Sequence, residues 1–428
     1  MNNPKLHIVH CVDTEGPLQE SLDATFDRLH DSKGFKFEPS DDLLKRLQNK
    51  EIDLDGREEE VADYLHPRRL AYLNNWVEVS EMVSELMSED YRKKYKDTQN
   101  SVYKFSWFII DVVGYKNNPR NKDIGFHHIW DKYIGLLKNN IFDDCLGWHF
   151  HTVPVGGNAL EYNSCWTNND YHEQVLCRRI IERGSFPSIY RAGGTIERND
   201  LSYWLEQFIP FDFSCVSTYT REGGPGWNYD WRHSPKRWGF YHPDFYDYRK
   251  VGNMKRAIFR CLDVDTLHTS ITIDDVLQAF EQVQNGETTI LAVSGHDRRD
   301  LRPEVEKFYG LVVDASKKFK DIKWVFSNAL EAAKDTLNMS KNQPPKFTIS
   351  IKQHYVEIVS DQDIFGPIPF LAIEEENKVF FRANPTIENS NTWVYKISRP
   401  SKTKAIGVAA SNISGDVGVQ VVTILPNS

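Results

Sequence analysis

Long hydrophobic runs are missing from this sequence of 428 residues. No stretch approaches the roughly 20 consecutive apolar residues that a membrane-spanning helix needs. The apolar run near the start, residues 6–12, is too short and too polar for the hydrophobic region of a secretory signal. We therefore expect no membrane span and a cytoplasmic protein.

Cysteine is also scarce. The six cysteines are scattered without a close pair, whereas small secreted domains that rely on disulfides carry a much denser set. Reduced thiols fit this spacing better, which agrees with the cytoplasmic expectation. The cysteines are Cys11, Cys145, Cys165, Cys177, Cys215 and Cys261.

Positively charged residues are fewer than negatively charged ones: the sequence has 52 Lys and Arg and 61 Asp and Glu, which gives a formal net charge of −9. Proteins that bind nucleic acid neutralise its phosphates with clustered Lys and Arg, so we expect no nucleic-acid partner. The sequence also lacks a glycine-rich phosphate loop, a G-x-S-x-G nucleophile turn and the Cys–His spacing of a zinc finger.

What the sequence does contain is an alternation of predicted strands and helices, which is typical of a parallel sheet, open or closed into a barrel. A charge-rich, mostly helical segment at residues 20–100 interrupts it, and we interpret this segment as an insertion. Chemistry in such folds gathers at the carboxyl ends of the strands. We predict strands at 6–12, 102–113, 145–148, 211–217, 289–293 and 324–326, and helices at 129–137, 171–183 and 305–319.

The pattern changes after residue 337. Residues 338–346 have the composition of a linker, and short alternating runs follow over 347–428, which predicts an all-β domain of the sandwich type. The expected organisation is a catalytic domain at 1–337, containing the helical insertion, followed by the linker and the β domain.

Two acidic residues follow the first predicted strand. Asp13 and Glu15 lie in the run Asp-Thr-Glu-Gly. Two carboxylates at the end of a strand can share one site, with one binding a cation while the other acts as a base. Taken alone, the cluster fits equally a turn with solvated acidic side chains.

A pair of histidines, His149 and His151, follows another predicted strand in the run Gly-Trp-His-Phe-His-Thr. Two imidazoles on an irregular loop can converge on one cation. Imidazole together with carboxylate suits Zn²⁺ or a related divalent ion. The alternative is that both histidines are hydrogen-bonded within the strand.

Arg191 and His296 each follow a further predicted strand. Arg191, which precedes two glycines, can orient a buried carboxylate by a bidentate contact, although a surface ion pair is the simpler interpretation. His296 is placed to act as a general acid, with Asp297 or Asp212 setting its tautomer.

In their order along the chain, these motifs resemble those of the NodB-type polysaccharide deacetylases, in the branch with Asp-x-Glu-Gly and His-x-His motifs. The resemblance spans about residues 5–335 and says nothing of 346–428. It implies a distorted (β/α) barrel, here with a helical insertion and followed by the all-β domain. It also implies hydrolysis of an amide bond with a divalent metal ion, most simply Zn²⁺.

The resemblance implies a role for each matching residue. Asp13 matches the acid that acts as the catalytic base, and Glu15 matches the acid that binds the metal. His149 and His151 match the metal-binding histidines. The commoner family pattern has adjacent aspartates and histidines four apart, so the two acidic roles stay exchangeable here, and His172 is an alternative second imidazole.

The remaining family roles fall on three residues. Arg191 matches the arginine that orients the base, and His296 matches the histidine that protonates the leaving group. Asp212 matches the acid that tunes this histidine.

The segment 226–248 is rich in aromatic residues, among them Trp227, Trp231 and Tyr241. Such rings stack on the apolar faces of sugars, so these three are candidate substrate-binding residues. The alternative is a long loop that packs on the mouth of the barrel through its own rings.

These observations predict a metal-dependent hydrolase that removes an acetyl or other acyl group from an N-acetylated sugar or a polysaccharide precursor. A nucleotide- or lipid-linked sugar suits a cytoplasmic enzyme better than an extracellular polymer. An allantoinase-like cyclic amide hydrolase is the rival within the enzyme class, and a non-catalytic carbohydrate-binding or scaffold protein is the rival outside it. The β domain would bind glycan or mediate homo-oligomer formation.

Overall fold

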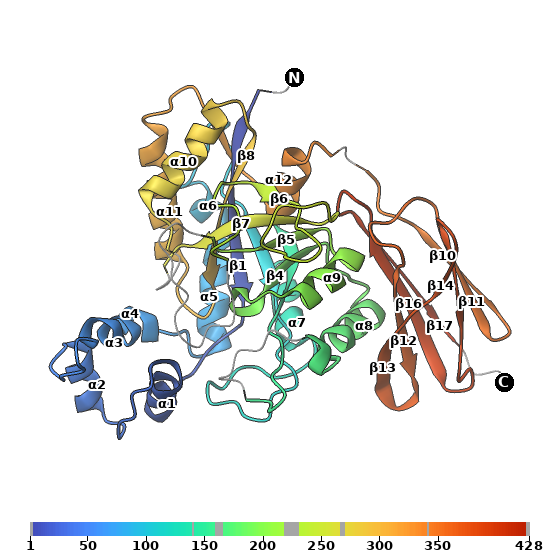
Figure 1. The fold of residues 1–428 in the computed structure, drawn as a ribbon, viewed down its shortest axis with the longest axis horizontal. Coiled ribbons are helices and arrows are strands. Elements are labelled where there is room, and N and C mark those ends of the chain that lie inside the picture. Colours follow the sequence, from blue (N-terminus) through green and yellow to red (C-terminus); the bar gives the residue numbers. More distant parts are fainter. Residues whose placement is uncertain are drawn as a thin grey trace.

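The central sheet of the protein is a closed barrel of parallel strands (Figure 1). It is seen in a computed structural model that describes residues 3–138, 141–158, 166–217, 231–265, 270–339 and 342–424. The barrel closes because its first strand pairs with both the second and the last, which confirms the predicted α/β barrel. In order around the barrel, the seven strands are β1 (Lys5–Thr14), β2 (Phe105–Ile109), β3 (Cys145–Phe150), β4 (Ile189–Ala192), β5 (Phe211–Cys215), β7 (Ala257–Asp263) and β8 (Thr289–His296).

β1 has three partners. Residues 6–13 pair with β8 on one side. On the other side, its amino half pairs with β9 (Lys323–Phe326) and its carboxyl half with β2. A short strand, β6 (Phe240–Tyr241), lies antiparallel against β7. β1 is therefore enclosed along both edges, which agrees with its nearly continuous burial.

Side chains that point into the barrel form an apolar core below a polar layer. Successive residues of a strand point to opposite faces, so Val9, Cys11 and Asp13 of β1 share the interior face. The core beneath Asp13 is one buried cluster, which includes Val9, Cys11, Phe108, Phe213, Phe259, Cys261 and Ala292. Asp13 lies above this cluster, where the strands end.

Amphipathic helices cover the outside of the barrel. α10 (Ile273–Gln284) is a clear case, because its buried residues recur at spacings of three and four. Thr272 and Asp275 form a capping box at its start. The other helices that follow β2 are α7 (His128–Leu136), α8 (Tyr171–Arg183), α9 (Asn199–Phe208), α11 (Arg302–Ser316) and α12 (Ala329–Thr336), with short 3₁₀ turns η1 (Trp166–Asn168), η2 (Gly193–Thr195) and η3 (Glu376–Lys378).

The helical insertion between β1 and β2 has two parts. The first four helices form a module with its own small core, built around Phe26, Leu29 and Val61, and Figure 1 shows this module projecting from the barrel. The fifth helix instead buries its apolar face in the core outside the barrel sheet. The helices are α1 (Leu22–Lys33), α2 (Asp41–Gln48), α3 (Glu58–Tyr64), α4 (Pro67–Leu70), α5 (Trp76–Leu86) and α6 (Glu89–Arg92).

The module of α1–α4 joins the barrel through a narrow neck. The amide of Leu18 donates to the carbonyl of Leu73 at 2.9 Å, and the amide of Leu73 donates to the carbonyl of Arg298 at 2.8 Å. The chain therefore leaves the barrel just after β1 and returns beside the segment that follows β8.

The C-terminal region consists of two antiparallel sheets of four strands. Val356 and Trp393 of one sheet and Leu371 and Ile406 of the other belong to a single buried cluster, so the predicted all-β sandwich is confirmed. One sheet has the order β10 (Phe347–Lys352), β11 (Tyr355–Ser360), β15 (Thr392–Lys396), β14 (Thr386–Asn389), and the other β13 (Val379–Ala383), β12 (Phe370–Glu375), β16 (Thr403–Ser411), β17 (Val417–Thr423).

The sandwich packs against α8 and α9 through the second of these sheets (Figure 1). Phe370 is fully buried, and its ring centroid lies 5.4 Å from that of Phe186 and 5.3 Å from that of Phe208. At the same junction, a Cβ added to Gly366 would lie 1.6 Å from the carbonyl oxygen of Gln207. The barrel and the sandwich therefore share a close-packed apolar interface.

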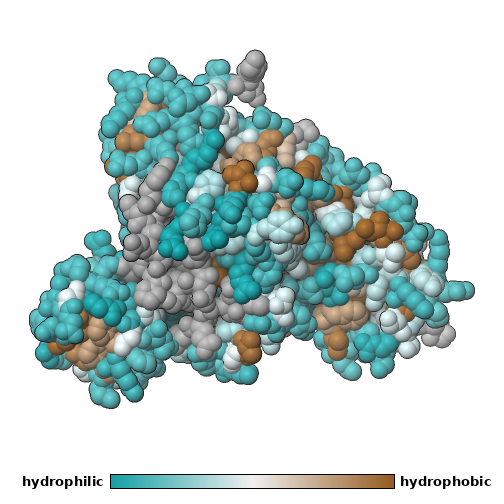
Figure 2. All heavy atoms as spheres, viewed as in Figure 1, coloured by the Kyte–Doolittle hydropathy of each residue, from teal (hydrophilic) through white to brown (hydrophobic). Residues whose placement is uncertain are grey.

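The face of the molecule in Figure 2 is mostly hydrophilic, and hydrophobic side chains gather on it over the module of α1–α4 and over the C-terminal sheets. Among the described residues, no helix is long and apolar enough to cross a membrane.

Replacing Phe370 with alanine is expected to lower the free energy of unfolding by about 3–5 kcal/mol, because it opens a cavity in the interface between sandwich and barrel. Denaturant unfolding followed by tryptophan fluorescence and circular dichroism measures this. Val379→Ala on the neighbouring strand is the control, since Val379 is 48% exposed and a surface change costs about 0.5 kcal/mol or less. Equal effects of the two substitutions would contradict the shared interface.

Candidate functional site

Strand register brings predicted site residues together at the carboxyl end of the barrel. Asp13 on β1 pairs with His296 on β8, and His149 on β3 pairs with Arg191 on β4. Neighbouring strands lie about 4.8 Å apart, so residues far apart in the sequence become close neighbours.

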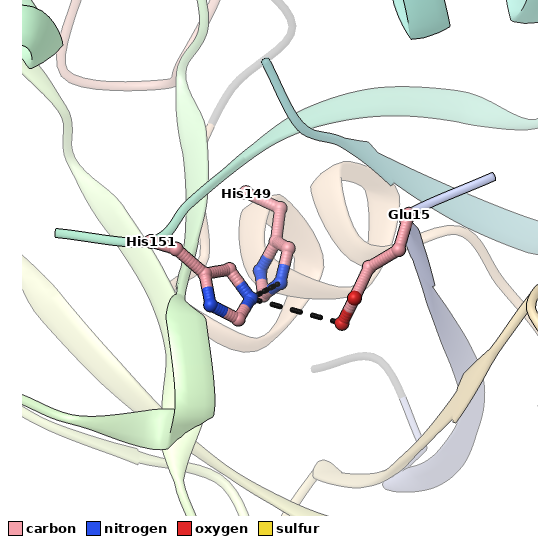
Figure 3. Close-up of side chains that lie close together, drawn as sticks. All are labelled: Glu15, His149 and His151. Carbon is pink, nitrogen blue, oxygen red and sulfur yellow. Dashed lines mark hydrogen bonds and ion pairs between the residues drawn. The ribbon is translucent and has the colours of Figure 1, made fainter. Parts of the chain in front are cut away.

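Glu15, His149 and His151 form a group that could hold a metal ion (Figure 3). One ligand atom from each lies within 4.8 Å of the others. Nε2 of His149 is 3.0 Å from Nε2 of His151, which in turn is 3.7 Å from Oε1 of Glu15. His151 is partly exposed while the other two are buried, so the group can be reached from the His151 side.

A backbone carbonyl sets the tautomer of His149, a candidate metal ligand. Its Nδ1 lies 3.0 Å from the carbonyl oxygen of Arg191. A carbonyl oxygen only accepts, so Nδ1 carries the hydrogen and the lone pair of Nε2 faces His151. Burial lowers the pKa of His149 to about 4, against the opposing effect of Asp13. The imidazole is therefore neutral near pH 7, which is the form that ligates metals.

Glu15 is held between two cations. Its Oε1 accepts a hydrogen bond from Nη1 of Arg298 at 2.8 Å, and its Oε2 accepts one from Nζ of Lys122. Burial alone would raise the pKa of Glu15, but Arg298 and Lys122 hold it well below its usual value. The carboxylate is therefore ionised, as a metal ligand must be.

Asp13 is clamped by the buried guanidinium of Arg191. Nε of Arg191 donates to Oδ2 of Asp13 at 2.9 Å, Nη1 to the carbonyl of Phe213 at 2.7 Å, and Nη2 to Oγ of Ser294 at 2.7 Å. Ser294 in turn donates to Asp263 at 2.6 Å. One of these contacts holds Oδ2 of Asp13, and the others hold the guanidinium in place.

The donor set fits a divalent cation. Two imidazole nitrogens and a carboxylate oxygen are ligands typical of Zn²⁺ and related ions. Oδ1 of Asp13 is also buried without a hydrogen-bond partner among the described residues, and lies 3.7 Å from Nδ1 of His149. A buried carboxylate oxygen without a partner beside three potential ligands indicates a site that is completed by a bound group.

His296 lies beside both acids. Its Nε2 is 3.7 Å from Oδ2 of Asp13 and 3.9 Å from Oε1 of Glu15. Burial, together with the charge of Arg298, holds the pKa of His296 well below its usual value. The side chain is therefore a neutral imidazole at neutral pH.

Asp297 shapes the turn that follows β1. Its carboxylate accepts hydrogen bonds from the amides of Glu15 at 2.7 Å and Gly16 at 2.9 Å, and from the hydroxyl of Tyr133 at 2.6 Å. Gly16 has a positive φ of 72°, and a Cβ there would lie 2.9 Å from the ring of Trp76, so this position requires glycine. Burial raises the pKa of Asp297 to about 6 against these hydrogen bonds.

Asp212 lies in a different buried charge cluster. Its carboxylate accepts hydrogen bonds from Arg256 at 2.7 Å and from the amide of Ser214 at 2.9 Å, and Arg256 also contacts Glu197. The hydrogen bonds described for Asp212 and for Asp297 do not include the His296 imidazole. That either acid tunes this histidine stays a prediction.

The structure buries the candidate aromatic residues that it describes. Trp231 is 3% exposed and donates its indole N–H to the carbonyl of Thr195 at 2.8 Å. Tyr241 is 7% exposed and donates its hydroxyl to the carbonyl of Tyr248 at 2.8 Å. Trp227 lies outside the described residues. The burial favours the alternative in which these rings pack on the barrel.

His172 lies apart from the metal-binding group. It is buried in α8 against the ring of Trp166, at 4.5 Å between centroids. Burial lowers its pKa to about 3. His151 is therefore the second imidazole that the structure places beside His149.

Sequence analysis did not identify Lys122, Arg298, Asp263 or Ser294 as site residues. Ser294 lies two residues before His296 and Arg298 two residues after it, so the sequence around His296 already gave a signal for both. The sequence around Lys122 gave no such signal, because Lys122 lies 107 residues from the carboxylate that it contacts.

Comparisons with known proteins give little further guidance. No protein-family model matches the chain, and no curated protein sequence matches it. A candidate glycoside hydrolase/deacetylase from Parabacteroides distasonis is similar with a TM-score of 0.38 and 9% identity, over 89% of this chain and 85% of that one. A complex of the pro- and mature domains of Porphyromonas gingivalis RgpB reaches a TM-score of 0.17 at 9% identity, over 98% of this chain and 100% of the other.

Metal content tests the group of Glu15, His149 and His151. Purified protein incubated with zinc and desalted is expected to retain about one ion per chain, and His149→Ala is expected to lose it, because a missing ligand removes most of the affinity. Elemental analysis measures both. His30→Ala on α1 is the control, since His30 lies on the surface of the module of α1–α4. Equal metal in wild type and His149→Ala would refute the assignment.

A second test uses the close packing of η2 against His151. A Cβ at Gly193 would lie 2.5 Å from Cδ2 and 2.7 Å from Cα of His151. Gly193→Ala is therefore expected to displace this ligand and weaken zinc binding about 10- to 100-fold, as measured by competition with a zinc chelator. Gly310→Ala on α11, where a Cβ meets nothing within 4 Å, is the matched control. Unchanged affinity in Gly193→Ala would show that His151 is not a ligand.

Proposed function

We propose that the protein is a metal-dependent amide hydrolase that removes an acyl group, most simply acetyl, from an N-acylated sugar. The observation that carries the proposal is the meeting of Glu15, His149 and His151 within 4.8 Å of one another, directly beside Asp13 and His296. A ligand group, a candidate base and a candidate acid in one place are the components of acyl hydrolysis. The NodB-type resemblance of the motifs agrees with it.

In this proposal, Glu15, His149 and His151 hold the divalent cation. When bound, such a cation polarises the acyl carbonyl and lowers the pKa of water toward about 7. The low pKa of His149 and of Glu15 supports their role as ligands, because both side chains are already in the deprotonated form that binds metal. Glu15 is favoured over Asp13 as the acidic ligand, since a carboxylate oxygen of Glu15 lies within 4.8 Å of the ligand atoms of both histidines.

Asp13 is assigned the role of general base. Arg191 fixes its Oδ2, so Oδ1, which has no hydrogen-bond partner among the described residues, is left to take a proton from water. The new C–O bond forms at the acyl carbon, the C–N bond breaks, and the proton must finally reach the departing nitrogen.

His296 is assigned the transfer of that proton. Its imidazole is neutral at rest because burial lowers its pKa, so it acts as an acid only after it receives a proton. Asp13 is the neighbouring acid, with Oδ2 3.7 Å from Nε2 of His296, and the proton that its carboxylate takes from water on Oδ1 must move to the side of His296 before the imidazole receives it. The two side chains together then carry the proton from water to the amine.

Asp13→Asn tests this assignment. Acetate release from N-acetylglucosamine oligomers and from nucleotide-linked N-acetylglucosamine is measured with zinc-loaded protein. The substitution is expected to lower kcat about 10²- to 10⁴-fold, because it removes the general base, while the zinc content is retained. Asp314→Asn on the exposed face of α11 is the control for loss of one carboxylate.

Three outcomes would change the proposal. Full turnover by Asp13→Asn would remove Asp13 as the base. Opening of a cyclic amide without acetate release would favour hydrolysis of the allantoinase type. Sugar binding without any hydrolysis by the wild-type protein would favour a carbohydrate-binding protein.

A further inference from the structure

A groove lies at the start of α9, apart from the group of Glu15, His149 and His151. Its volume is about 620 Å³, and it is lined by residues 197–200 and by residues 244 and 246–250. Pockets of about 300–1,000 Å³ are typical of sites for small molecules. None of the described residues that line the groove has a role in the proposed reaction, so the groove needs an explanation of its own.

The groove lies at the same end of the barrel as the candidate metal ligands. η2 follows the end of β4 and α9 begins at Asn199, so residues 197–200 belong to a connection at the carboxyl ends of the strands. Gly193 of this connection packs against His151. Glu197 is four residues further along the chain and therefore at most about 14 Å from Gly193. The groove thus lies within the length of a short oligosaccharide from His151.

The segment 243–251, which contributes half of the groove, is a closed hairpin. Its two ends pair with each other, and inside them the amide of Asp244 donates to the carbonyl of Lys250 at 2.8 Å. A Cβ added to Gly252 would lie 2.3 Å from Cα of Asp244, so the chain that leaves the hairpin packs directly on the chain that enters it. The hairpin is therefore held by its own backbone.

Asn199 joins this hairpin to α9. Its Nδ2 donates to the carbonyl of Tyr246, and its Oδ1 accepts from the amide of Tyr248 at 3.1 Å. The amide of Tyr246 donates to Oδ1 of Asp244 at 2.8 Å. The backbone of Tyr246 is thus fixed on both sides, while Tyr246 as a whole is 79% exposed.

The exposed ring of Tyr246 belongs to a row of three rings. Phe245 is 50% exposed and stacks on Tyr203, with 4.5 Å between centroids and 25° between planes. The ring of Tyr246 meets that of Phe245 edge to face at 5.2 Å. Neighbouring aromatic rings that a rigid segment holds in solvent are typical of a binding surface.

The polar side chains of the groove offer donors and acceptors in similar number. Arg198 is paired with Asp200 at 3.0 Å and Arg249 with Asp247 at 2.8 Å. A sugar hydroxyl both donates and accepts, so it can bind a carboxylate oxygen and a guanidinium N–H at once. A balanced set of this kind suits a neutral ligand rather than an ion. The charged residues of the groove are Glu197, Arg198, Asp200, Asp244, Asp247, Arg249 and Lys250.

We propose that this groove binds neutral sugar units of a chain whose acylated unit lies at the candidate metal ligands, so that the substrate is an oligosaccharide or polysaccharide and not a single sugar. This inference rests on the proposed function. Tyr246 is assigned the stacking contact with a sugar ring, and the ion-paired side chains bind hydroxyl groups. The predicted candidates Trp231 and Tyr241 do not fill this role, since both are buried.

Calorimetry on the full chain tests the groove. The ligands are N-acetylglucosamine and its oligomers from the dimer to the hexamer, titrated with zinc bound and again after chelation. The longer oligomers are expected to bind at least about tenfold tighter than the monosaccharide. They are also expected to keep measurable affinity after chelation, because no candidate metal ligand is among the described residues that line the groove.

Tyr246→Ala is expected to lower the affinity for the longer oligomers about tenfold and to leave that for the monosaccharide unchanged, because it removes the stacking ring. Replacement of so exposed a residue costs little stability, which circular dichroism checks. Tyr246→Phe keeps the ring and is expected to keep the affinity. Tyr355→Ala on β11 is the matched control, since it removes a tyrosine that is 48% exposed on the sandwich.

Four results would overturn the inference. They are absence of oligomer binding, equal affinity for monosaccharide and hexamer, equal affinity of wild type and Tyr246→Ala, and binding that disappears completely on chelation. A loss in Tyr355→Ala as large as that in Tyr246→Ala would instead place the sugar chain on the sandwich, and would also overturn it.

Acetate release from the same oligomers separates this inference from the proposed function. If both hold, Tyr246→Ala raises KM for the hexamer about tenfold with little change in kcat, because it removes binding remote from the reacting bond. Length-dependent binding without acetate release keeps the sugar groove and removes the hydrolase. Acetate release with a KM that depends neither on chain length nor on Tyr246 keeps the hydrolase and removes the groove.

Discussion

The buried guanidinium of Arg191 links neighbouring strands by hydrogen bonds at the carboxyl end of the barrel. From β4 it donates to Asp13 on β1, to the carbonyl of Phe213 on β5 and to Ser294 on β8. Withdrawal of an ion from water costs several kcal/mol, and only well-formed contacts with all its hydrogen-bond partners offset that cost. Because the guanidinium is planar and rigid, the sheet itself sets the direction of the Asp13 carboxylate. Every role assigned to Asp13 and His296 depends on that direction.

Opposite electrostatic effects set the charge of the two kinds of candidate metal ligand. Burial keeps the imidazole of His149 neutral, while Lys122 and Arg298 keep the carboxylate of Glu15 ionised. The ring of His149 is also oriented by the backbone carbonyl of Arg191. A site prepared in this way needs little rearrangement when a ligand arrives, and preorganisation of this kind preserves affinity.

Much of this site could be predicted because motif residues that end parallel strands must meet at one end of a barrel. The meeting of Asp13, Glu15, His149 and His151 followed from that rule, whereas the sandwich followed from the short alternating runs after the linker. β7 was not predicted, since Arg260 interrupts its apolar run and only the tertiary structure provides its partner, Asp275. Lys122 could not be found either, because a contact across 107 residues leaves no local pattern.

Because of its narrow neck, the helical module can change in length without a change in the positions of the site residues on the barrel. Leu18 and Leu73 are hydrogen-bonded to each other, so the chain leaves and re-enters the barrel at adjacent points. The entropic cost of such a loop grows only slowly with its length. The part of the module away from the neck can therefore lengthen or shrink while Glu15 keeps its place, whereas Arg69 of α4 is hydrogen-bonded to Arg299 after β8. In related chains with this architecture, the segments around the carboxyl end of the barrel can differ while the site residues at that end stay the same.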